Sequence, residues 1–202
     1  MLTIALPKGR IAEETLDKFE KAFGEKFIFE DRKLILEKAG FRFLNVRNQD
    51  VPTYVMHGAA DLGVVGLDVL EEKEYDLIKL LDLKLGRCKV AFGLRAGEQL
   101  NFNKSKITIA TKHEVIAKKY FEQKAMAVEI IKLYGSIELA PLVGLCDCIV
   151  DIVETGETMK QNGLEIGPTI MESSAHLIAN KNSFYAKKDL ILSLKERIEV
   201  HL

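Results

Sequence analysis

The segment from Asp151 to Thr158 combines residue types that suit the binding of a sugar phosphate. It reads D-I-V-E-T-G-E-T, so a carboxylate stands four residues before a threonine, a glycine and, after one more residue, a second threonine. Glycine lets the backbone approach an anion closely, and threonine hydroxyls donate hydrogen bonds without bulk. A helix starting here would add N–H groups and a favourable dipole. We therefore expect Thr155, Gly156 and Thr158 to hold a phosphate and Asp151 to accept hydrogen bonds from two ribose hydroxyls.

The same eight residues also fit a simpler structure, a capped helix after a buried strand. In that interpretation Thr155 is the N-cap residue of the helix and Asp151 is solvated. Residues 144–150 are small or β-branched enough to form the buried strand. In open α/β sheets, ligands gather at the carboxyl ends of strands, which is where Asp151 falls. The segment alone leaves both interpretations open.

The composition is that of an ordinary globular protein. The 202 residues are 48% hydrophobic, and 29 lysines and arginines nearly balance 30 aspartates and glutamates, which gives no indication of nucleic-acid binding. The first apolar run is broken by Pro7 and precedes its basic residues, unlike a signal peptide. No apolar segment approaches the roughly 20 residues that span a bilayer. We expect a cytoplasmic protein that binds neither nucleic acid nor membrane.

The cysteines and histidines do not predict a metal site. The three cysteines, Cys88, Cys146 and Cys148, are odd in number, and the side chains of a C-x-C pair in a strand point to opposite faces. We expect them to be buried free thiols. The four histidines are scattered without the spacing of metal ligands, so we expect structural or surface roles for them.

Strand-like and helix-like segments alternate along the chain. Apolar residues at spacings of three and four predict helices, and short runs of β-branched and apolar residues predict strands. The predicted strands span residues 2–6, 41–46, 61–66, 106–111, 128–134 and 146–153. The predicted helices span residues 11–23, 113–124 and about 136–143, with short helices after Asp50 and from Gly156. This alternation predicts an α/β fold with mainly parallel sheets.

A break in the alternation, between residues 81 and 100, predicts two lobes. Two strand-like runs follow one another here without a helix between them, as when a chain crosses from one lobe to another. The last predicted helix carries four apolar residues on one face: Leu190, Ile191, Leu194 and Ile198. We expect this helix to return to the first lobe, so that lobe I comprises residues 1–88 and 178–202. Lobe II, residues 89–177, then holds the phosphate loop.

The surroundings of the phosphate loop resemble one known family. Its pattern is a glutamate, a glycine six residues later, an aspartate and the T-G-x-T loop, which stand here as Glu138, Gly144, Asp151 and residues 155–158. The resemblance continues in the same order through four further stretches, residues 5–10, 47–55, 58–70 and 119–136. It therefore covers nearly the whole chain, which resembles ATP phosphoribosyltransferase, the enzyme family that opens histidine biosynthesis.

The resemblance implies a fold and a reaction. The fold has two lobes like those of type II periplasmic binding proteins, with the active site in the cleft between them. Family members transfer the phosphoribosyl group of 5-phosphoribosyl 1-diphosphate to N1 of ATP, release diphosphate and require magnesium. Because adenine N1 has a free lone pair, no strong general base is needed. Catalysis would rest on placing N1 against the anomeric carbon and on stabilising the departing diphosphate.

The resemblance also implies roles for particular side chains. Lys8, Arg10 and Arg32 are the expected catalytic cations at the phosphates and diphosphate, and Arg47 is a further candidate. Glu138 and Asp151 are expected on the ribose side, directly or through water and a magnesium ion that the substrate carries. The other expected substrate-binding residues form the loop itself: Glu154, Thr155, Gly156, Glu157 and Thr158.

Three acidic residues near these motifs carry separate expectations. Glu157 occupies a loop position where a carboxylate would repel a bound phosphate, so we expect its side chain to face solvent. Asp50 is expected to cap a short helix that has Pro52 in its first turn. Asp68 is either a surface residue or part of the nucleotide cleft.

Within the family, the chain resembles the short form, because it has no residues after the last helix for a histidine-binding domain. Short forms act with a regulatory subunit related to histidyl-tRNA synthetase, commonly as hetero-octamers, and the isolated catalytic chain tends to be a homodimer. Two alternative functions stay open. One is a phosphoribosyltransferase for another base, and the other is a non-catalytic, two-lobed protein that binds a small molecule.

Overall fold

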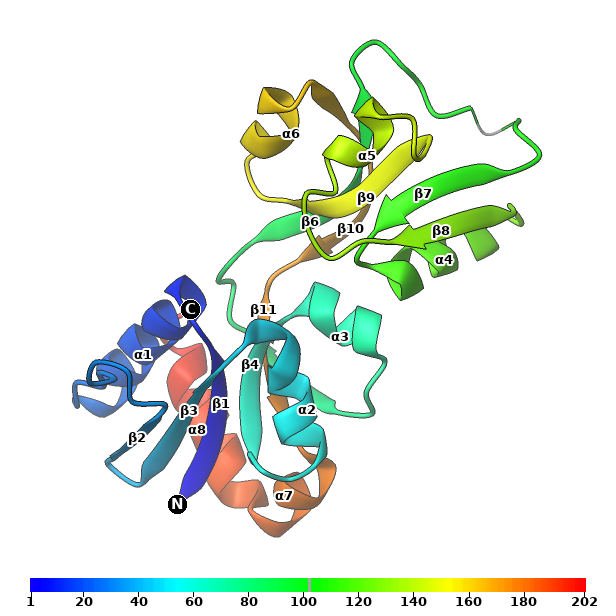
Figure 1. Ribbon diagram of the computed structural model, residues 1–202. Coiled ribbons are helices and arrows are strands. Elements are labelled where there is room, and N and C mark those ends of the chain that lie inside the picture. The colour runs from blue at the N-terminus through cyan, green and yellow to red at the C-terminus, as the bar shows by residue number, and fades with distance from the viewer. Residues whose placement is uncertain (102) are drawn as a thin grey trace. The chain divides into compact units, whose positions relative to one another are not determined.

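The computed structural model describes residues 1–101 and 103–202, which form two compact units (Figure 1). The first unit comprises Met1–Gly86 and Ser174–Leu202, and the second comprises Arg87–Ser173. The chain thus returns to the first unit at Ser174 rather than at the expected residue 178. The reason is that strand β11 (Ala175–Ala179) pairs along its whole length with β4 (Leu62–Gly66) of the first unit.

The described part of the first unit is built on a six-stranded sheet with the order β2-β3-β1-β4-β11-β5. Its remaining strands are β1 (Leu2–Pro7), β2 (Ile35–Lys38), β3 (Phe41–Val46) and β5 (Ile78–Asp82). Strands β1, β3, β4 and β5 run in one direction, and β2 and β11 run in the other. Because β1 and β3 are parallel and adjacent, the loops that follow them lie at the same edge of the sheet.

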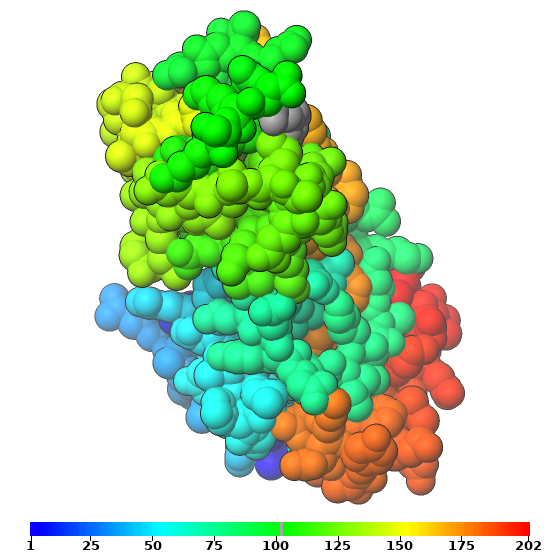
Figure 2. Space-filling model, turned by 90° about the vertical axis from the view of Figure 1, so that its right-hand side faces the viewer, coloured from blue at the N-terminus to red at the C-terminus, as the bar shows by residue number. Residues whose placement is uncertain are grey.

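Helices cover both faces of this sheet (Figure 1). They are α1 (Arg10–Phe23), the 3-10 helix η1 (Asn48–Asp50), α2 (Val51–Met56), α3 (Leu67–Lys73), α7 (Lys181–Ala186) and α8 (Lys188–Glu199). Helices α1 and α8 share one apolar core with the sheet, and α2 and α3 share another. In Figure 2 the orange C-terminal segment lies against the cyan and teal residues of the N-terminal part. None of the helices in the described residues is long and apolar enough to cross a membrane.

The apolar face of α8 differs slightly from the prediction. Ile191, Leu194 and Ile198 are buried against the sheet, but Leu190 is 49% exposed. A spacing of three and then four residues from Ile191 follows one stripe of a helix, and Leu190 lies about 100° to one side of its start. The helix therefore buries a narrower face than the sequence suggested.

The described part of the second unit contains a five-stranded sheet with the order β10-β6-β9-β7-β8. Its strands are β6 (Cys88–Arg95), β7 (Ile107–Thr111), β8 (Val128–Lys132), β9 (Cys148–Val153) and β10 (Leu164–Ser173). All of them except β6 run in the same direction. Helix α4 (Glu114–Glu122) packs on one face, and α5 (Leu139–Leu142) and α6 (Glu157–Gln161) contribute to the core on the other.

The three cysteines are free thiols, as predicted, but they differ in burial. Cys146 and Cys148 are buried in two separate cores of the second unit, whereas Cys88 is only partly buried. Burial, the largest influence, raises the pKa of the Cys148 thiol to about 12 and also raises that of Cys146. Both thiols therefore stay protonated near neutral pH and act as small apolar side chains.

Candidate functional site

The candidate site begins where the parallel strands β7 and β9 end their pairing. Thr111, the last residue of β7, pairs with Val150 of β9, so Asp151 is the next residue of β9 beyond that pair. The Thr111 hydroxyl donates a hydrogen bond to the Val150 carbonyl at 2.6 Å and accepts one from the His113 N–H at 2.8 Å. These two bonds are buried and fix residues 112 and 113 beside Asp151.

A cavity of about 390 Å³ opens at this end of the second unit. Its lining residues are Lys112, Glu138, Ile152, Val153, Glu154, Thr155, Gly156, Thr158 and Met159. The volume lies within the roughly 300–1,000 Å³ that is usual for small-molecule sites. The structure therefore brings Glu138 together with the loop residues Glu154, Thr155, Gly156 and Thr158, and their role in substrate binding stays a prediction.

The loop that lines this cavity turns at Gly156. This glycine has φ of 81° and ψ of −1°, in the left-handed region, and it occupies the N-cap position of α6. The simpler interpretation, in which Thr155 is the N-cap residue, therefore does not hold, because Gly156 has that position. The Thr155 hydroxyl still accepts a long hydrogen bond, 3.4 Å, from the Glu157 N–H in the first turn of α6. Because α6 has only five residues, anion binding would depend on the loop's own N–H groups and hydroxyls more than on a helix dipole.

A substitution of Gly156 should weaken binding of a sugar phosphate. In Gly156→Ala the new Cβ atom would lie 2.4 Å from Ile166 Cδ1, in a left-handed conformation that costs an L-residue about 1–2 kcal/mol. The loop should relax away from this geometry, and we expect the Kd for ribose 5-phosphate, measured by calorimetry, to rise about tenfold. The control is Gly163→Ala, at φ of 73° with no atom within 4 Å of the new Cβ. Equal losses of affinity in both variants would contradict a specific role of the Gly156 turn.

One carboxylate oxygen of Asp151 has three close neighbours. Its Oδ1 atom accepts a hydrogen bond from the Ile152 N–H at 2.8 Å and lies 3.1 Å from Lys112 Nζ. His113, which is buried, places its Nε2 atom 3.9 Å from the same oxygen. The side chain of Asp151 is only 13% exposed, so the interpretation of Asp151 as a solvated residue is wrong.

The side chain of Glu157 contacts its own helix. Its side chain is exposed and accepts a hydrogen bond from Gln161 Nε2 at 3.0 Å, one turn further along α6. It is absent from the residues that line the cavity. The prediction that this carboxylate faces solvent is confirmed, and any contribution of Glu157 to substrate binding would come from its backbone.

The predicted cations all belong to the first unit and are all exposed. Lys8 follows β1, its N–H donates to the Val46 carbonyl at 2.9 Å, and Arg47 comes directly after that residue. Lys8 and Arg47 thus follow the ends of two adjacent parallel strands. Arg10 begins α1, and its Nε lies 3.8 Å from Glu14 Oε1. Arg32 lies in the turn before β2. The role of these four residues in phosphate binding stays a prediction.

Two aspartates of the first unit depart from expectation. Asp50 occupies the N-cap position of α2, but its side chain makes no capping hydrogen bond. Asp68, in the first turn of α3, is only 3% exposed. The interpretation of Asp68 as a surface residue is therefore wrong.

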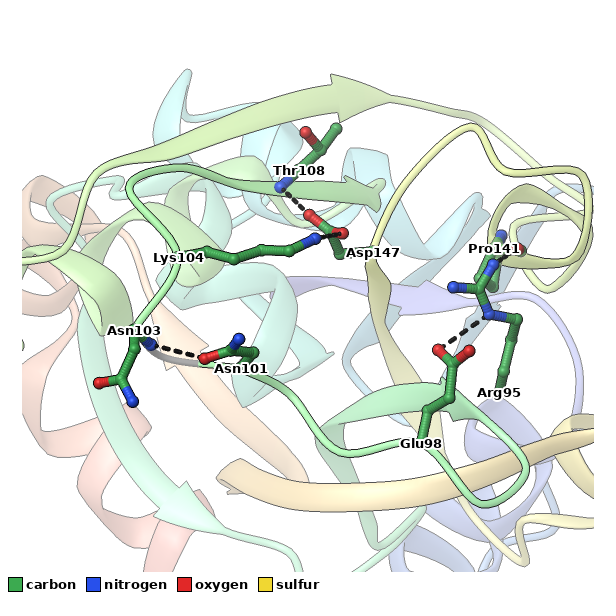
Figure 3. A network of polar contacts seen from close by, with 8 residues as sticks. All are labelled: Arg95, Glu98, Asn101, Asn103, Lys104, Thr108, Pro141 and Asp147. Atoms are coloured by element: carbon green, nitrogen blue, oxygen red, sulfur yellow. Dashed lines mark hydrogen bonds and ion pairs between the residues drawn. The ribbon is translucent and has the colours of Figure 1, made fainter.

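Asp147, four residues before Asp151, has a structural role. Its carboxylate accepts hydrogen bonds from Lys104 and, at 2.9 Å, from the Thr108 N–H (Figure 3). The Lys104 hydrogen bond, followed by that of Thr108, lowers the pKa of Asp147 below its ordinary value. Figure 3 also shows Arg95, which donates to Glu98 and to the Pro141 carbonyl. The first set of contacts ties β7 to the segment before β9, the second ties β6 to α5, and none of these residues lines the cavity.

Sequence reasoning did not identify Lys112. A single lysine after a strand is normally a solvated residue, so its type carries no signal. The position of Lys112 does carry a signal. A strand that lies beside the strand of Asp151 and runs parallel to it must end close to Asp151. That neighbour could not be chosen from the sequence, since the order of the strands was not predicted.

Comparisons with known proteins identify the family of this chain. A family model described as HisG: ATP phosphoribosyltransferase matches residues 47–200. The ATP phosphoribosyltransferase of Sulfurovum sp. (strain NBC37-1) is 67% identical over 199 residues, which are 98% of this chain and 97% of that protein. The structure of the ATP phosphoribosyl transferase (HisG:HisZ) complex from Thermotoga maritima matches with a TM-score of 0.85 and 37% identity, over 98% of this chain and 97% of that one.

A more distant likeness concerns the fold alone. The periplasmic aliphatic sulphonate binding protein SsuA from Escherichia coli is 12% identical, with a TM-score of 0.63 over 98% of this chain and 67% of that chain. The predicted α/β fold of the type II periplasmic-binding-protein kind is thereby confirmed. The family model matches most residues of this chain, and the two family members named above are 67% and 37% identical to it over 98% of its length. The chain therefore belongs to the ATP phosphoribosyltransferase family.

Proposed function

We propose that this chain carries out the reaction of its family, the first step of histidine biosynthesis. It transfers the 5-phosphoribosyl group of 5-phosphoribosyl 1-diphosphate to N1 of ATP and releases diphosphate. The observation that carries this proposal is the cavity of the second unit, where Thr155, Gly156 and Thr158 of the phosphate loop line one space with Glu138. Asp151 lies next to this space through its contact with the lining residue Lys112.

The loop and Asp151 bind the two ends of the sugar phosphate. The hydroxyls of Thr155 and Thr158 and the N–H groups of the loop donate to the 5-phosphate. Asp151, an acceptor-only group when ionised, takes hydrogen bonds from the ribose hydroxyls. Glu138, which lines the same cavity, serves the ribose side as well. This assignment uses each group in the role that its chemistry allows.

The transfer step needs position and charge rather than a strong base. Adenine N1 supplies the electron pair of the new bond to the anomeric carbon, and the pair of the breaking carbon–oxygen bond leaves with diphosphate. No proton moves in this step. The protein contributes by holding N1 in line with the anomeric carbon and by stabilising negative charge on the leaving group. We assign the second of these tasks to the cations Lys8, Arg10, Arg32 and Arg47.

Magnesium fits the donor groups of the cavity. It is a hard cation that prefers oxygen ligands and is often held by one or two carboxylates together with substrate phosphates. Glu138 and Glu154 line the cavity, but the described residues contain no group of three or more histidines, cysteines, aspartates and glutamates that could hold a metal ion. We therefore propose that the ion arrives with the diphosphate and contacts Glu138 or Asp151. When bound, it neutralises charge on the leaving diphosphate.

The partner follows from the relative whose structure is a HisG:HisZ complex. We propose that this chain is likewise the catalytic subunit of an assembly with a HisZ-type regulatory subunit that resembles histidyl-tRNA synthetase. The assembly would be a hetero-octamer, and the free chain a homodimer. We place it in the cytoplasm, where ATP and 5-phosphoribosyl 1-diphosphate are made.

The test is the absorbance rise that accompanies formation of N1-phosphoribosyl-ATP. The purified chain is mixed with ATP, 5-phosphoribosyl 1-diphosphate, magnesium and a diphosphatase, with and without a HisZ-type partner. We expect product with ATP and none when another purine or a pyrimidine nucleotide replaces it. Transfer to another base would favour the alternative phosphoribosyltransferase, and binding without any transfer, with the partner present, would favour a non-catalytic protein.

A further inference from the structure

We infer that Lys112 binds the anionic sugar phosphate directly and is a substrate-binding residue of this enzyme. The inference rests on the proposed function, because it names a further contact in the same cavity. It depends on three observations: the way in which Lys112 is positioned, the charges that line the cavity, and the geometry of its contact with Asp151.

The backbone around Lys112 is anchored by hydrogen bonds, which hold this residue at the cavity. The hydrogen bonds of Thr111 to Val150 and His113 fix the chain on both sides of Lys112, and all three of these residues are buried. The backbone of residue 112 is therefore anchored to the end of β9. Its side chain lines the same cavity as the phosphate loop. A lysine on a mobile surface loop would have neither constraint.

The charges of the cavity lining indicate a role for Lys112 in binding an anion. Among the lining residues the charged groups are two glutamates, Glu138 and Glu154, and one cation, Lys112. A sugar phosphate that enters this space meets two carboxylates of the same sign, which oppose its binding. Within the lining, Lys112 is the side chain that offsets this repulsion. The hydroxyls of Thr155 and Thr158 donate hydrogen bonds but carry no charge.

The contact between Lys112 and Asp151 leaves room for a ligand. The Nζ atom lies 3.1 Å from Asp151 Oδ1, and the Lys112 side chain is 37% exposed. An ammonium group has three donors on a flexible stem, so one can stay on Asp151 while others reach an oxygen of the ligand. Lys112 would thus connect the carboxylate that takes the ribose hydroxyls with the anion held by the loop.

The structural alternative is an ion pair that only holds Asp151 in place. An exposed ion pair of the same unit provides the matched control: Lys106 Nζ lies 2.7 Å from Glu129 Oε2, and both side chains are more than half exposed. Lys106 is absent from the cavity lining. Replacing it removes the same charge from the same unit without touching the site.

The experiment measures binding of ribose 5-phosphate to the full chain by calorimetry. We expect Lys112→Met to raise the Kd about 10- to 100-fold, as for loss of a charge-assisted hydrogen bond. Lys112→Arg should stay within about fivefold of wild type, because it keeps the charge. Lys106→Met should stay within about twofold. In the steady state, Lys112→Met should raise the KM for 5-phosphoribosyl 1-diphosphate and leave that for ATP nearly unchanged.

A double-mutant cycle with Asp151→Asn separates direct binding from positioning. If Lys112 contacts the ligand, Lys112→Met should weaken binding in the Asp151→Asn background by a similar factor as in wild type. Loss of that effect in the Asp151→Asn background would overturn the inference, as would a Lys112→Met variant that binds like wild type. Should Lys112→Met not fold, the Lys112→Arg and Lys112→Gln pair decides: equal affinities would overturn it. Failure of the wild-type chain to bind ribose 5-phosphate would count against the proposed function instead.

Discussion

Asp151→Asn should lower kcat/KM for 5-phosphoribosyl 1-diphosphate by about 100-fold or more. The carboxylate can accept hydrogen bonds from two ribose hydroxyls, and each such bond to a charged group contributes about 1.5–3 kcal/mol. Asparagine keeps the shape of the side chain but loses the charge and one acceptor. Because Oδ1 faces both the Ile152 N–H and Lys112, the amide oxygen would keep that position, and the NH₂ group would replace Oδ2, where it cannot accept from a ribose hydroxyl. Both effects weaken the binding of the sugar in the transition state.

The matched control for Asp151→Asn is Asp147→Asn. Asp147 lies in the same unit and also contacts a lysine, but its partners, Lys104 and the Thr108 N–H, lie outside the cavity. This change should lower the stability of the second unit and leave kcat/KM within about threefold of wild type. Initial rates at varied 5-phosphoribosyl 1-diphosphate, with ATP saturating, measure both variants. Equal losses of kcat/KM in the two would remove Asp151 from the ribose site.

Much of the fold could be predicted because most elements have a clear period. The strand at residues 41–46 was predicted with its observed bounds, and α1 begins one residue before the expected start. Parallel strands buried on both faces give continuous apolar runs, and amphipathic helices give spacings of three and four. Local patterns of this kind are enough to predict a helix or strand when its neighbours in the fold do no more than bury its apolar residues.

Strand β10 could not be predicted because its sequence argues against a strand. It contains Gly167 and Pro168, which normally end a strand or mark an irregularity. The structure places β10 at the edge of the sheet, and its pairing with β6 shifts register between Ile166 and Thr169, around these two residues. An edge strand tolerates a proline because one side of its backbone has no partner strand. That allowance depends on tertiary position, which the local sequence does not reveal.

The site could be predicted only in part, because one of its residues also depends on tertiary position. Residues 151–158 are contiguous, so their types and spacing could indicate a phosphate loop from the sequence alone. Lys112 joins them from 39 residues earlier through the pairing of β7 with β9. Its contribution depends on strand order, and no local pattern carries that information. Contacts between segments far apart in the chain are thus the part of a site that sequence reasoning misses first.

Lys187→Met should lower the free energy of unfolding of the first unit by about 2–3 kcal/mol. Asp61, just before β4, is buried, and both of its carboxylate oxygens accept hydrogen bonds from Lys187 Nζ at 2.8 Å. One of them also accepts from the Thr3 N–H at 2.9 Å. Methionine would leave the carboxylate buried beside a thioether that cannot donate. The Lys187 side chain is 38% exposed, so water can partly replace it, which keeps the cost below that of a fully buried pair.

The effect of Lys187→Met should depend on pH in a defined direction. Burial acts to raise the pKa of Asp61, but the hydrogen bonds from Lys187 and Thr3 outweigh it, so the pKa lies below its ordinary value of 3.8. A carboxylate with a depressed pKa stabilises the fold above that ordinary value, and its contribution is lost as the pH falls through the folded-state pKa. In the variant burial acts without the lysine, and the carboxyl group can be protonated instead. The difference in stability from wild type should therefore be full at pH 7 and shrink toward pH 3.

Urea unfolding followed by circular dichroism measures this difference, and Lys181→Met is the control. Lys181 is the first residue of helix α7 and pairs with Asp76. This pair is exposed, with 48% of the Lys181 side chain and 73% of the Asp76 side chain accessible. Exposed pairs of this kind contribute about 0–1 kcal/mol, because water solvates each ion well when its partner is removed. The two variants remove the same charge from the same C-terminal segment and differ in the burial of the aspartate left behind. A loss of stability for Lys187→Met that matches Lys181→Met, or that stays constant down to pH 3, would show that Asp61 does not depend on Lys187.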